Sequence, residues 1–263
     1  PWVRRFVTLL YRDNNCELVV GGAKHAGFAI HSGIRQGCPL SPLLFAVAAD
    51  VLLRRLRRLL PDAVLRAYAD DLAAVVPGGL DSAPMLAKIV QEFAEISCLR
   101  LNLPKTVIVP LHLQDHRAVA QALHAVTPSW AGIRIAGAAK YLGFYLGPQR
   151  GHLTTQQPVA KYLRRAQDWG NTPSGLFLAS AAYSVYVLPV LAFVLQLDEL
   201  PPGWEEHEAV ALRRLATGPG QWCQPQDLRH LKSFGMPKDF ASPSQVALAA
   251  KLRVATYEAA AAG

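Results

Sequence analysis

The chain has 263 residues, 51% of them hydrophobic and 17% charged, which fits one large globular domain or two of ordinary size. Its 27 Lys and Arg exceed its 19 Asp and Glu, so the net charge of +8 favours a polyanionic partner. No apolar run approaches the ~20 residues of a membrane span, so we expect no such span. No CxxC pair is present, so we expect no zinc site. The scattered cysteines favour reduced thiols in an intracellular compartment; they are Cys16, Cys38, Cys98 and Cys223.

Apolar periodicity and turn residues define the expected elements of the first half of the chain. Ser41 and Pro42 are typical of a helix N-cap and first helical position, and Pro61 ends that helix. The pattern predicts a helix over 2–12, a hairpin of strands 16–20 and 27–31, a loop over 33–42, a helix over 41–60, a hairpin over 64–76, a helix from 81 to about 98 and a strand over 107–109.

The second half changes from strands to helices. Residues 133–135 and 141–146 predict a second hairpin, and helices follow over 155–169, 173–196 and 203–216. The apolar run that contains Pro189 suits a buried helix or helix pair, and the chain ends in an alanine-rich stretch. Strands followed by helices predict an α+β unit and then a helical unit, with the boundary near Gly147–Pro148.

Two adjacent carboxylates, Asp70 and Asp71, lie between short apolar runs of the predicted hairpin. Such carboxylates repel each other and lose solvation, which a bound metal ion relieves, although a solvated turn also explains an isolated Asp pair. A site for two metal ions needs carboxylates that hold the ions about 3.5–4 Å apart. Because side chains alternate along a strand, the pair supplies only part of such a site, and a further carboxylate is needed.

The segment Gly33-Ile34-Arg35-Gln36-Gly37-Cys38-Pro39-Leu40-Ser41-Pro42-Leu43-Leu44-Phe45, together with Tyr68-Ala69-Asp70-Asp71, resembles the reverse transcriptases. Residues 102–106 resemble the Asn-x-x-Lys-Thr element of that family, and residues 140–144 resemble its Tyr-Leu-Gly element. Four motifs in this order favour the non-LTR retrotransposon branch. The resemblance implies an α+β fold, with a polymerase right-hand palm (an antiparallel sheet with helices) followed by a helical thumb. Residues 1–147 would form a partial palm with residual fingers elements, and 148–263 the thumb and a C-terminal extension.

The resemblance also implies roles for the residues that match its motifs. Asp70 and Asp71 would be catalytic and bind metal, Tyr68 would lie beside the primer end, and Lys105 would neutralise or protonate the leaving pyrophosphate. Arg35, Gln36 and Gly37 would lie near the incoming nucleotide and the template, and Tyr141, Leu142 and Gly143 would grip the primer. Lys161, Arg164 and Arg165 form a basic ridge at i, i+3 and i+4 that either tracks the duplex phosphates or is a solvated face.

The function that follows from the resemblance is RNA-templated DNA synthesis with Mg²⁺ or Mn²⁺, acting on an RNA template, a DNA primer and deoxynucleoside triphosphates in the nucleus. The family's first catalytic aspartate belongs to a motif before the helix at 2–12, so we expect this chain to be part of a longer protein and inactive alone. Two alternatives stay open: a non-catalytic nucleic-acid-binding remnant of a retroelement polymerase, and an unrelated α+β protein with accidental matches.

Overall fold

The computed structural model describes residues 2–31, 33–112, 115–172, 175–220 and 222–262. By its internal contacts the chain divides into two units, Pro1–Leu101 and Asn102–Gly263. Helices combine with small two-stranded sheets, three of them antiparallel, as expected of an α+β protein. The division falls earlier in the chain than the predicted palm and thumb boundary near Gly147, which stays a prediction.

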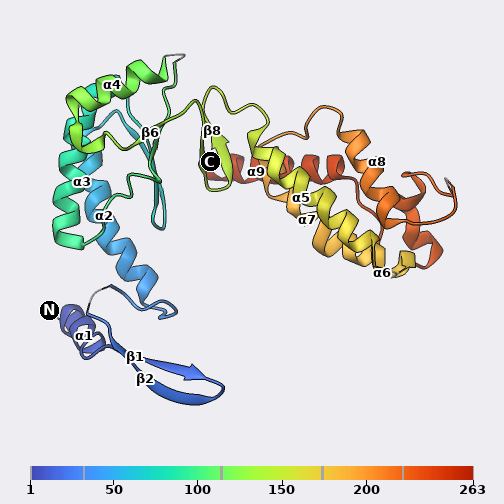
Figure 1. Ribbon diagram of the computed structural model, residues 1–263, viewed down its shortest axis with the longest axis horizontal. Coiled ribbons are helices and arrows are strands. Elements are labelled where there is room, and N and C mark those ends of the chain that lie inside the picture. The colour runs from blue at the N-terminus through green and yellow to red at the C-terminus, as the bar shows by residue number, and fades with distance from the viewer. Residues whose placement is uncertain (1, 32, 113–114, 173–174, 221, 263) are drawn as a thin grey trace. The chain divides into compact units, whose positions relative to one another are not determined.

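The first unit is built around α2 and α3, which lie side by side (Figure 1). Apolar residues of α2 and α3 bury Leu65 of strand β3 between them. Burial of one Leu or Ile side chain contributes about 1.5–3 kcal/mol, so this small core fixes the position of the β3–β4 hairpin. The elements are α1 (Trp2–Leu10), β1 (Asn15–Val20), β2 (Ala23–Ala29), α2 (Ser41–Leu59), β3 (Val64–Tyr68), β4 (Asp71–Val75), the 3₁₀ turn η1 (Gly79–Ser82) and α3 (Ala83–Ser97).

The start of α2 corrects one prediction. The N-cap residue is Leu40, and no side chain caps the helix; Ser41 is the first helical residue and is buried. The Ser41 hydroxyl donates instead to the carbonyl oxygen of Arg35, at 2.6 Å, and lies 3.1 Å from the Tyr11 hydroxyl. Capping by Ser41 is therefore wrong, because its hydroxyl joins the Arg35 loop and the end of α1 to α2.

The second unit contains two further small sheets. Strands β5 and β6 pair in parallel, and β7 and β8 form an antiparallel hairpin. The predicted pairing of 133–135 with 141–146 is wrong, because the unpredicted helix α4 carries the chain back to lay β6 beside β5, as parallel strands require. The elements are β5 (Val107–Ile108), α4 (His116–Val126), the 3₁₀ turn η2 (Pro128–Trp130), β6 (Arg134–Ile135), β7 (Ala139–Tyr141) and β8 (Phe144–Leu146).

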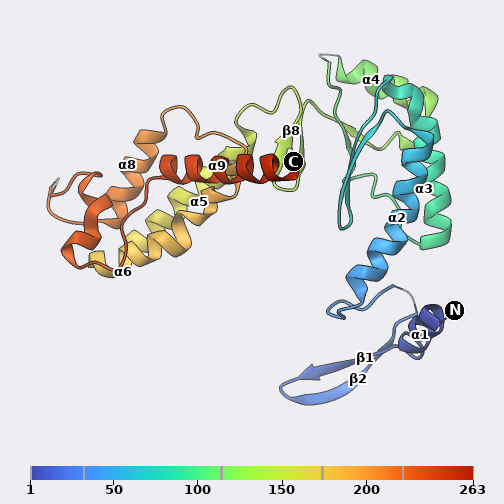
Figure 2. The same cartoon turned by 180° about the vertical axis from the view of Figure 1, so that it is seen from behind.

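Helices after β8 enclose the larger core. Helix α5 packs against α8, and α9 runs along α7, as Figures 1 and 2 show from opposite sides. The largest fully buried side chains there are Tyr162, Tyr183 and Phe240. The elements are α5 (Leu153–Gly170), α6 (Gly175–Ala182), the π-helix η3 (Tyr183–Val187), α7 (Pro189–Ala192), the 3₁₀ turns η4 (Val194–Gln196) and η5 (Asp227–Phe234), α8 (Trp204–Leu215) and α9 (Pro243–Ala262).

The predicted helix over 173–196 is divided into short elements. Its first two residues lie outside the described residues, and a π-turn follows α6, where the Leu188 amide donates to the Tyr183 carbonyl at 2.9 Å. Among the described residues, the stretch Gly175–Ala192 is long and apolar enough to cross a membrane, and 39% of it is buried inside the structure. Core helices have the same length and composition, so the predicted absence of a membrane partner stays a prediction.

A buried ion pair crosses the helical core. Glu208 of α8 is buried, and Nη2 of Arg229 donates to its Oε1 at 3.2 Å. Burial raises the pKa of Glu208 above the usual value of 4.5, and the nearby Arg229 only partly offsets that rise. The folded state therefore holds a proton on Glu208 at pH values where the unfolded chain has released it.

We expect the melting temperature of Glu208→Gln, relative to that of the wild type, to rise with pH. The raised pKa of Glu208 stabilises the folded wild type fully below pH 4.5, and this stabilisation is lost as pH rises through the raised pKa. Glutamine does not titrate, so the variant has no such contribution. Thermal melting across the pH series measures the difference, with the exposed Glu206→Gln as a control of flat response. A difference that is constant, or that falls as pH rises, would contradict the assignment.

Candidate active site

The two predicted metal ligands lie at the tip of the β3–β4 hairpin. Tyr68 pairs with Asp71 across the strands, so Ala69 and Asp70 form a two-residue turn. Ala69 has φ +50°, a left-handed conformation that costs a non-glycine residue roughly 1–2 kcal/mol. Non-glycine residues in this region are found disproportionately at functional sites.

The hairpin has an apolar face and a polar face. Leu65 faces the α2–α3 core, and strand alternation places Tyr68 on the opposite face, together with its cross-strand partner Asp71. Tyr68, Asp70 and Asp71 are all exposed. The packing of one strand face therefore turns the Tyr68 ring and the Asp71 carboxylate away from the helices.

The carboxylates fit part of a divalent-ion site. Within the described ranges, neither Asp70 nor Asp71 accepts a side-chain hydrogen bond or forms an ion pair, so their oxygens are available as ligands. Mg²⁺ is commonly bound by one or two carboxylates, with substrate phosphates and water completing its octahedron. The described part of the chain holds no group of three or more His, Cys, Asp or Glu side chains suited to a metal, so further ligands must come from elsewhere.

The Arg35–Gly37 loop is fixed to the end of α1. Nε of Arg35 donates to Oδ1 of the buried Asn14 at 2.5 Å, and its Nη2 donates to the Leu10 carbonyl at 3.1 Å. Its guanidinium also lies 5.5 Å from the centre of the Tyr11 ring. A carbonyl at a helix end has no partner inside the helix, so Arg35 satisfies one for α1.

The next two residues of this loop are exposed to solvent. Gly37 has φ +86°, a conformation that favours glycine, and a Cβ there would meet no atom within 4 Å. Backbone conformation, rather than lack of space, therefore explains the glycine. Of the three residues predicted near the nucleotide, Gln36 and Gly37 are accessible, and Arg35 shapes the loop from within.

Lys105 lies in a tight turn before β5, in the second unit. Its amide donates to the Asn102 carbonyl at 3.0 Å and is 3.2 Å from the Asn102 side-chain oxygen. Thr106 donates both its amide and its hydroxyl to the same carbonyl, at 2.9 Å each. The Asn-x-x-Lys-Thr segment thus forms a turn that its own hydrogen bonds close. The Lys105 side chain is exposed.

The Tyr-Leu-Gly segment is the turn of the β7–β8 hairpin. Tyr141 pairs with Phe144, and Leu142 and Gly143 have φ +48° and +94°, as a two-residue hairpin turn with two left-handed positions requires. A Cβ on Gly143 would lie 2.8 Å from Cε1 of Phe193, which also packs against Phe144 with ring centres 5.1 Å apart. Glycine therefore allows Phe193 to lie directly against this turn.

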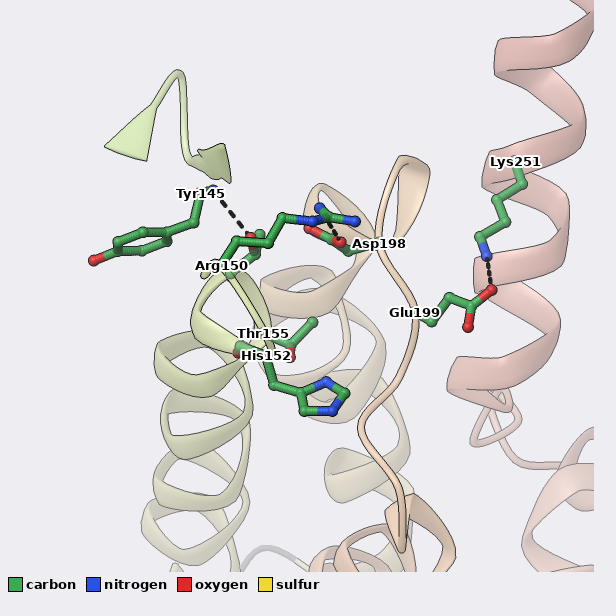
Figure 3. Close-up of polar contacts among 8 residues, drawn as sticks. Tyr145, Arg150, His152, Thr155, Asp198, Glu199 and Lys251 are labelled. Atoms are coloured by element: carbon green, nitrogen blue, oxygen red, sulfur yellow. Dashed lines mark hydrogen bonds and ion pairs between the residues drawn. The ribbon is translucent and has the colours of Figure 1, made fainter. Parts of the chain in front are cut away.

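Polar contacts hold the same hairpin to α5. The Tyr145 amide donates to Oγ1 of Thr154, near the start of α5, at 3.0 Å (Figure 3). Figure 3 also shows the ion pair between Nη1 of Arg150 and the buried Asp198, at 2.8 Å, which joins the loop before α5 to the loop before α8. No local pattern in the sequence marks Thr154, Asp198 or Phe193, because their partners lie 9, 48 and 49–50 positions away.

The hairpin and the first helix after it share an open hollow of about 280 Å³. Lys140 and Tyr145, which pair across the strands, line it together with Gln157, Lys161 and Phe193. The structure thus brings the predicted primer-gripping hairpin beside Lys161 of the predicted basic ridge.

The other two residues of the ridge differ in their environments. Arg164 is exposed, whereas Nη1 of Arg165 donates to the Tyr186 carbonyl of the π-helix. The sequence spacing alone does not separate them. Lys161 and Arg164 are accessible to a phosphate backbone, and Arg165 is partly committed to the fold.

Comparison with known proteins identifies the family. The model of the family described as "Reverse transcriptase (RNA-dependent DNA polymerase)" matches residues 1–146, which include the hairpin of Asp70 and Asp71, the Gln36 loop and the β7–β8 turn. The chain therefore belongs to the reverse transcriptase family.

Its relatives come from transposable elements. The chain is 26% identical, over 75% of its length, to the "Retrovirus-related Pol polyprotein from type-1 retrotransposable element R2" of Popillia japonica, and covers 34% of it. It is 33% identical, over 38% of its length, to the "Transposon TX1 uncharacterized 149 kDa protein" of Xenopus laevis, covering 8% of it. Over 17% of its length it is 44% identical to the "Retrotransposable element SLACS 132 kDa protein" of Trypanosoma brucei gambiense, covering 4% of it. The chain thus spans about a third or less of these relatives. The family and these relatives confirm the predicted non-LTR retrotransposon type.

We expect Gly143→Ala to destabilise the protein more than Gly203→Ala, by about 1–3 kcal/mol, the usual cost of overpacking. Both glycines have a left-handed backbone, but only at Gly143 would the new methyl group meet a ring, since nothing lies within 4 Å of a Cβ at Gly203. Urea denaturation of the two variants gives the difference. In a Phe193→Ala background the excess cost should disappear; an excess that persists would show that Phe193 is not its cause.

Proposed function

We propose that the protein to which this chain belongs catalyses RNA-templated DNA synthesis, and that Asp70 and Asp71 bind Mg²⁺ or Mn²⁺ for that reaction. The observation that carries the proposal is the hairpin tip, where two adjacent carboxylates are exposed and unpaired among the described residues, inside the segment that matches the family. A divalent ion relieves the repulsion between these carboxylates. When bound, such ions activate the primer 3′-hydroxyl and stabilise charge on the triphosphate.

The remaining roles belong to side chains around the substrates. The exposed Gln36 amide and Gly37 backbone are suited to contact the incoming nucleotide and the template, and the Tyr68 ring faces the same side of the hairpin as Asp71. Lys105 has an exposed ammonium that would neutralise the leaving pyrophosphate. We assign these roles by the motif matches, together with the exposure of each group.

The second unit would hold the primer–template duplex. The turn Tyr141–Gly143 packs against Phe193, at the end of α7, and strand β8 bonds to Thr154 of α5. Packing therefore sets its position relative to Lys161 and Arg164 of α5. Contacts from a rigid hairpin and a basic helix to sugar and phosphate position a duplex without reading its sequence. We propose this surface, with Lys140 added to it, as a primer-binding surface of the second unit.

A non-catalytic role in nucleic-acid binding is the alternative. It is favoured by one observation: the described residues supply the two adjacent aspartates but no cluster of three or more potential metal ligands. In that case the protein would bind nucleic acid through its basic surfaces and the aspartates would be a solvated turn. The two following experiments separate the alternatives.

We expect Asp70→Asn to lower primer extension by at least about a hundredfold, the scale of losing one electrostatic contact to the reacting groups. The protein to test is the longest polypeptide encoded by the reading frame that contains these residues, with an RNA template, a DNA primer and Mg²⁺. Binding of the duplex should stay near wild type, because the change removes one charge from an exposed turn. Undiminished extension would refute the catalytic assignment, and absence of extension in the wild type would favour the non-catalytic alternative.

Metal binding can be tested without activity. Fe²⁺ in place of Mg²⁺, supplied with hydrogen peroxide and with ascorbate to reduce Fe³⁺ again, is oxidised by the peroxide to give hydroxyl radicals that cleave the backbone beside the ion. Cleavage near Asp70 and Asp71 is therefore expected in the presence of duplex and a nucleoside triphosphate. The double variant Asp70→Asn with Asp71→Asn should lose these fragments. Asp81→Asn, an exposed aspartate on η1, is the matched control and should keep them. Equal cleavage in the wild type and the double variant would place the ion elsewhere.

A further inference from the structure

Helix α1 and the turn after it carry a basic face that the motif matches do not explain. Arg4, Arg5 and Arg12, with Thr8 and Leu9, line an open hollow of about 530 Å³. Within the helix Arg4 lies one turn from Thr8, and Arg12, in the turn after α1, lines the same hollow as Arg4 and Arg5. The apolar residues Trp2 and Phe6 face the other side of the helix. The arginines thus form one contiguous surface, here called the α1 arginine face.

No described carboxylate forms an ion pair with this face, although the exposed Asp13 follows Arg12 in the sequence. Its three arginines are exposed and form no ion pair with a described residue, and α1 contains no acidic residue. The nearby Glu17 is already paired with Lys24 at 2.9 Å. Like charges held on one helix face repel each other, so an anion bound there would remove an unfavourable interaction.

The chemistry of the face favours phosphate. All three cations are arginines, whose planar guanidinium groups offer paired donors that match two phosphate oxygens, whereas a lysine presents a single point charge. The arginines extend from the first turn of α1 to the turn that follows the helix, so the face suits a row of phosphates better than one small anion.

The position of the face relative to the template loop is fixed within the first unit. Arg35 donates to the Leu10 carbonyl at the end of α1 and to Asn14 just beyond it. Tyr11 contacts Ser41, whose hydroxyl bonds to the Arg35 carbonyl. These contacts couple α1 directly to the loop that presents Gln36 and Gly37.

We propose that the α1 arginine face binds the phosphate backbone of the template strand next to the Gln36–Gly37 loop. The inference rests on the proposed function, since that function places the template at this loop. It adds Arg4, Arg5 and Arg12 to the template-binding surface. They contact phosphates and read no base, so binding there is independent of template sequence.

The test uses the full chain and a fluorescently labelled RNA–DNA hybrid. The triple variant Arg4→Gln, Arg5→Gln and Arg12→Gln should reduce the slope of log K against log salt by up to about 2.7, at about 0.9 per phosphate. The matched control is Arg213→Gln, Lys238→Gln and Arg253→Gln, which removes the same charge from exposed positions of the second unit. It should leave the slope unchanged. An unchanged slope in the α1 variant, or an equal change in the control, would overturn the proposal.

A second arm identifies the strand. Methylphosphonate groups, which remove phosphate charge, should weaken wild-type binding when placed in the template strand and should have little further effect on the α1 variant. If neutral groups in the primer strand show this same pattern, the template assignment is wrong. Binding of the chain to anionic phospholipid vesicles that is lost in the α1 variant, without a change in hybrid binding, would assign the face to a membrane surface instead. These binding measurements need neither Mg²⁺ nor primer extension, so failure here is distinguishable from failure of the catalytic assignment.

Discussion

The candidate active site depends on the burial of one side chain, Leu65. It is the residue of the β3–β4 hairpin that enters the core between α2 and α3, beside Leu56 and Ile89. Because the side-chain period of a strand is two, a shift of one residue would bury Tyr68 and expose Leu65. Packing of one leucine thus fixes which face carries the Tyr68 ring and the Asp71 carboxylate. The chemistry at the tip is exposed, but the register that presents it is set in the core.

In the second unit, too, contacts with neighbouring elements hold a hairpin in place. Its β7–β8 hairpin is too short to be stable alone, since isolated two-stranded hairpins are marginal in water. It is held by Phe193 under Gly143, by Thr154 at the Tyr145 amide and, one loop further on, by the pair of Arg150 and Asp198. The glycine therefore has two separate reasons to be present: a left-handed backbone and the absence of a Cβ where the ring lies. Either reason alone would disfavour a substitution, and together they explain why the turn lies directly against Phe193 at the end of α7.

The sequence allowed the local elements to be predicted where periodicity and turn residues agree. The helix after Pro42 and the hairpin around Asp70 are examples, and both form as predicted. Partners far apart in the chain were not predictable. The parallel pairing of β5 with β6 depends on α4, which was not predicted although Asp115 caps its start by accepting from the Arg117 amide. Ser41 resembles an N-cap yet bonds to a carbonyl that only the folded loop brings near. The site residues followed from motif matches, and their roles remain proposals. The motifs did not indicate which basic side chains bond to other groups of the protein.

That distinction matters more for nucleic-acid binding than the net charge does. Arg35, Arg150 and Arg165 each donate to a carbonyl or a carboxylate of the protein. Their existing hydrogen bonds make these guanidinium groups poor candidates for releasing counterions from a phosphate backbone, because they would first have to leave their partners. Other exposed cations form no ion pair with a described residue. They include the α1 arginine face and the group of Lys140, Lys161 and Arg164. The net charge of +8 does not separate cations that bond within the protein from cations that are open to a ligand. The uncompensated cations, rather than the total, define where a polyanion would be held, and each of the two units carries its own set.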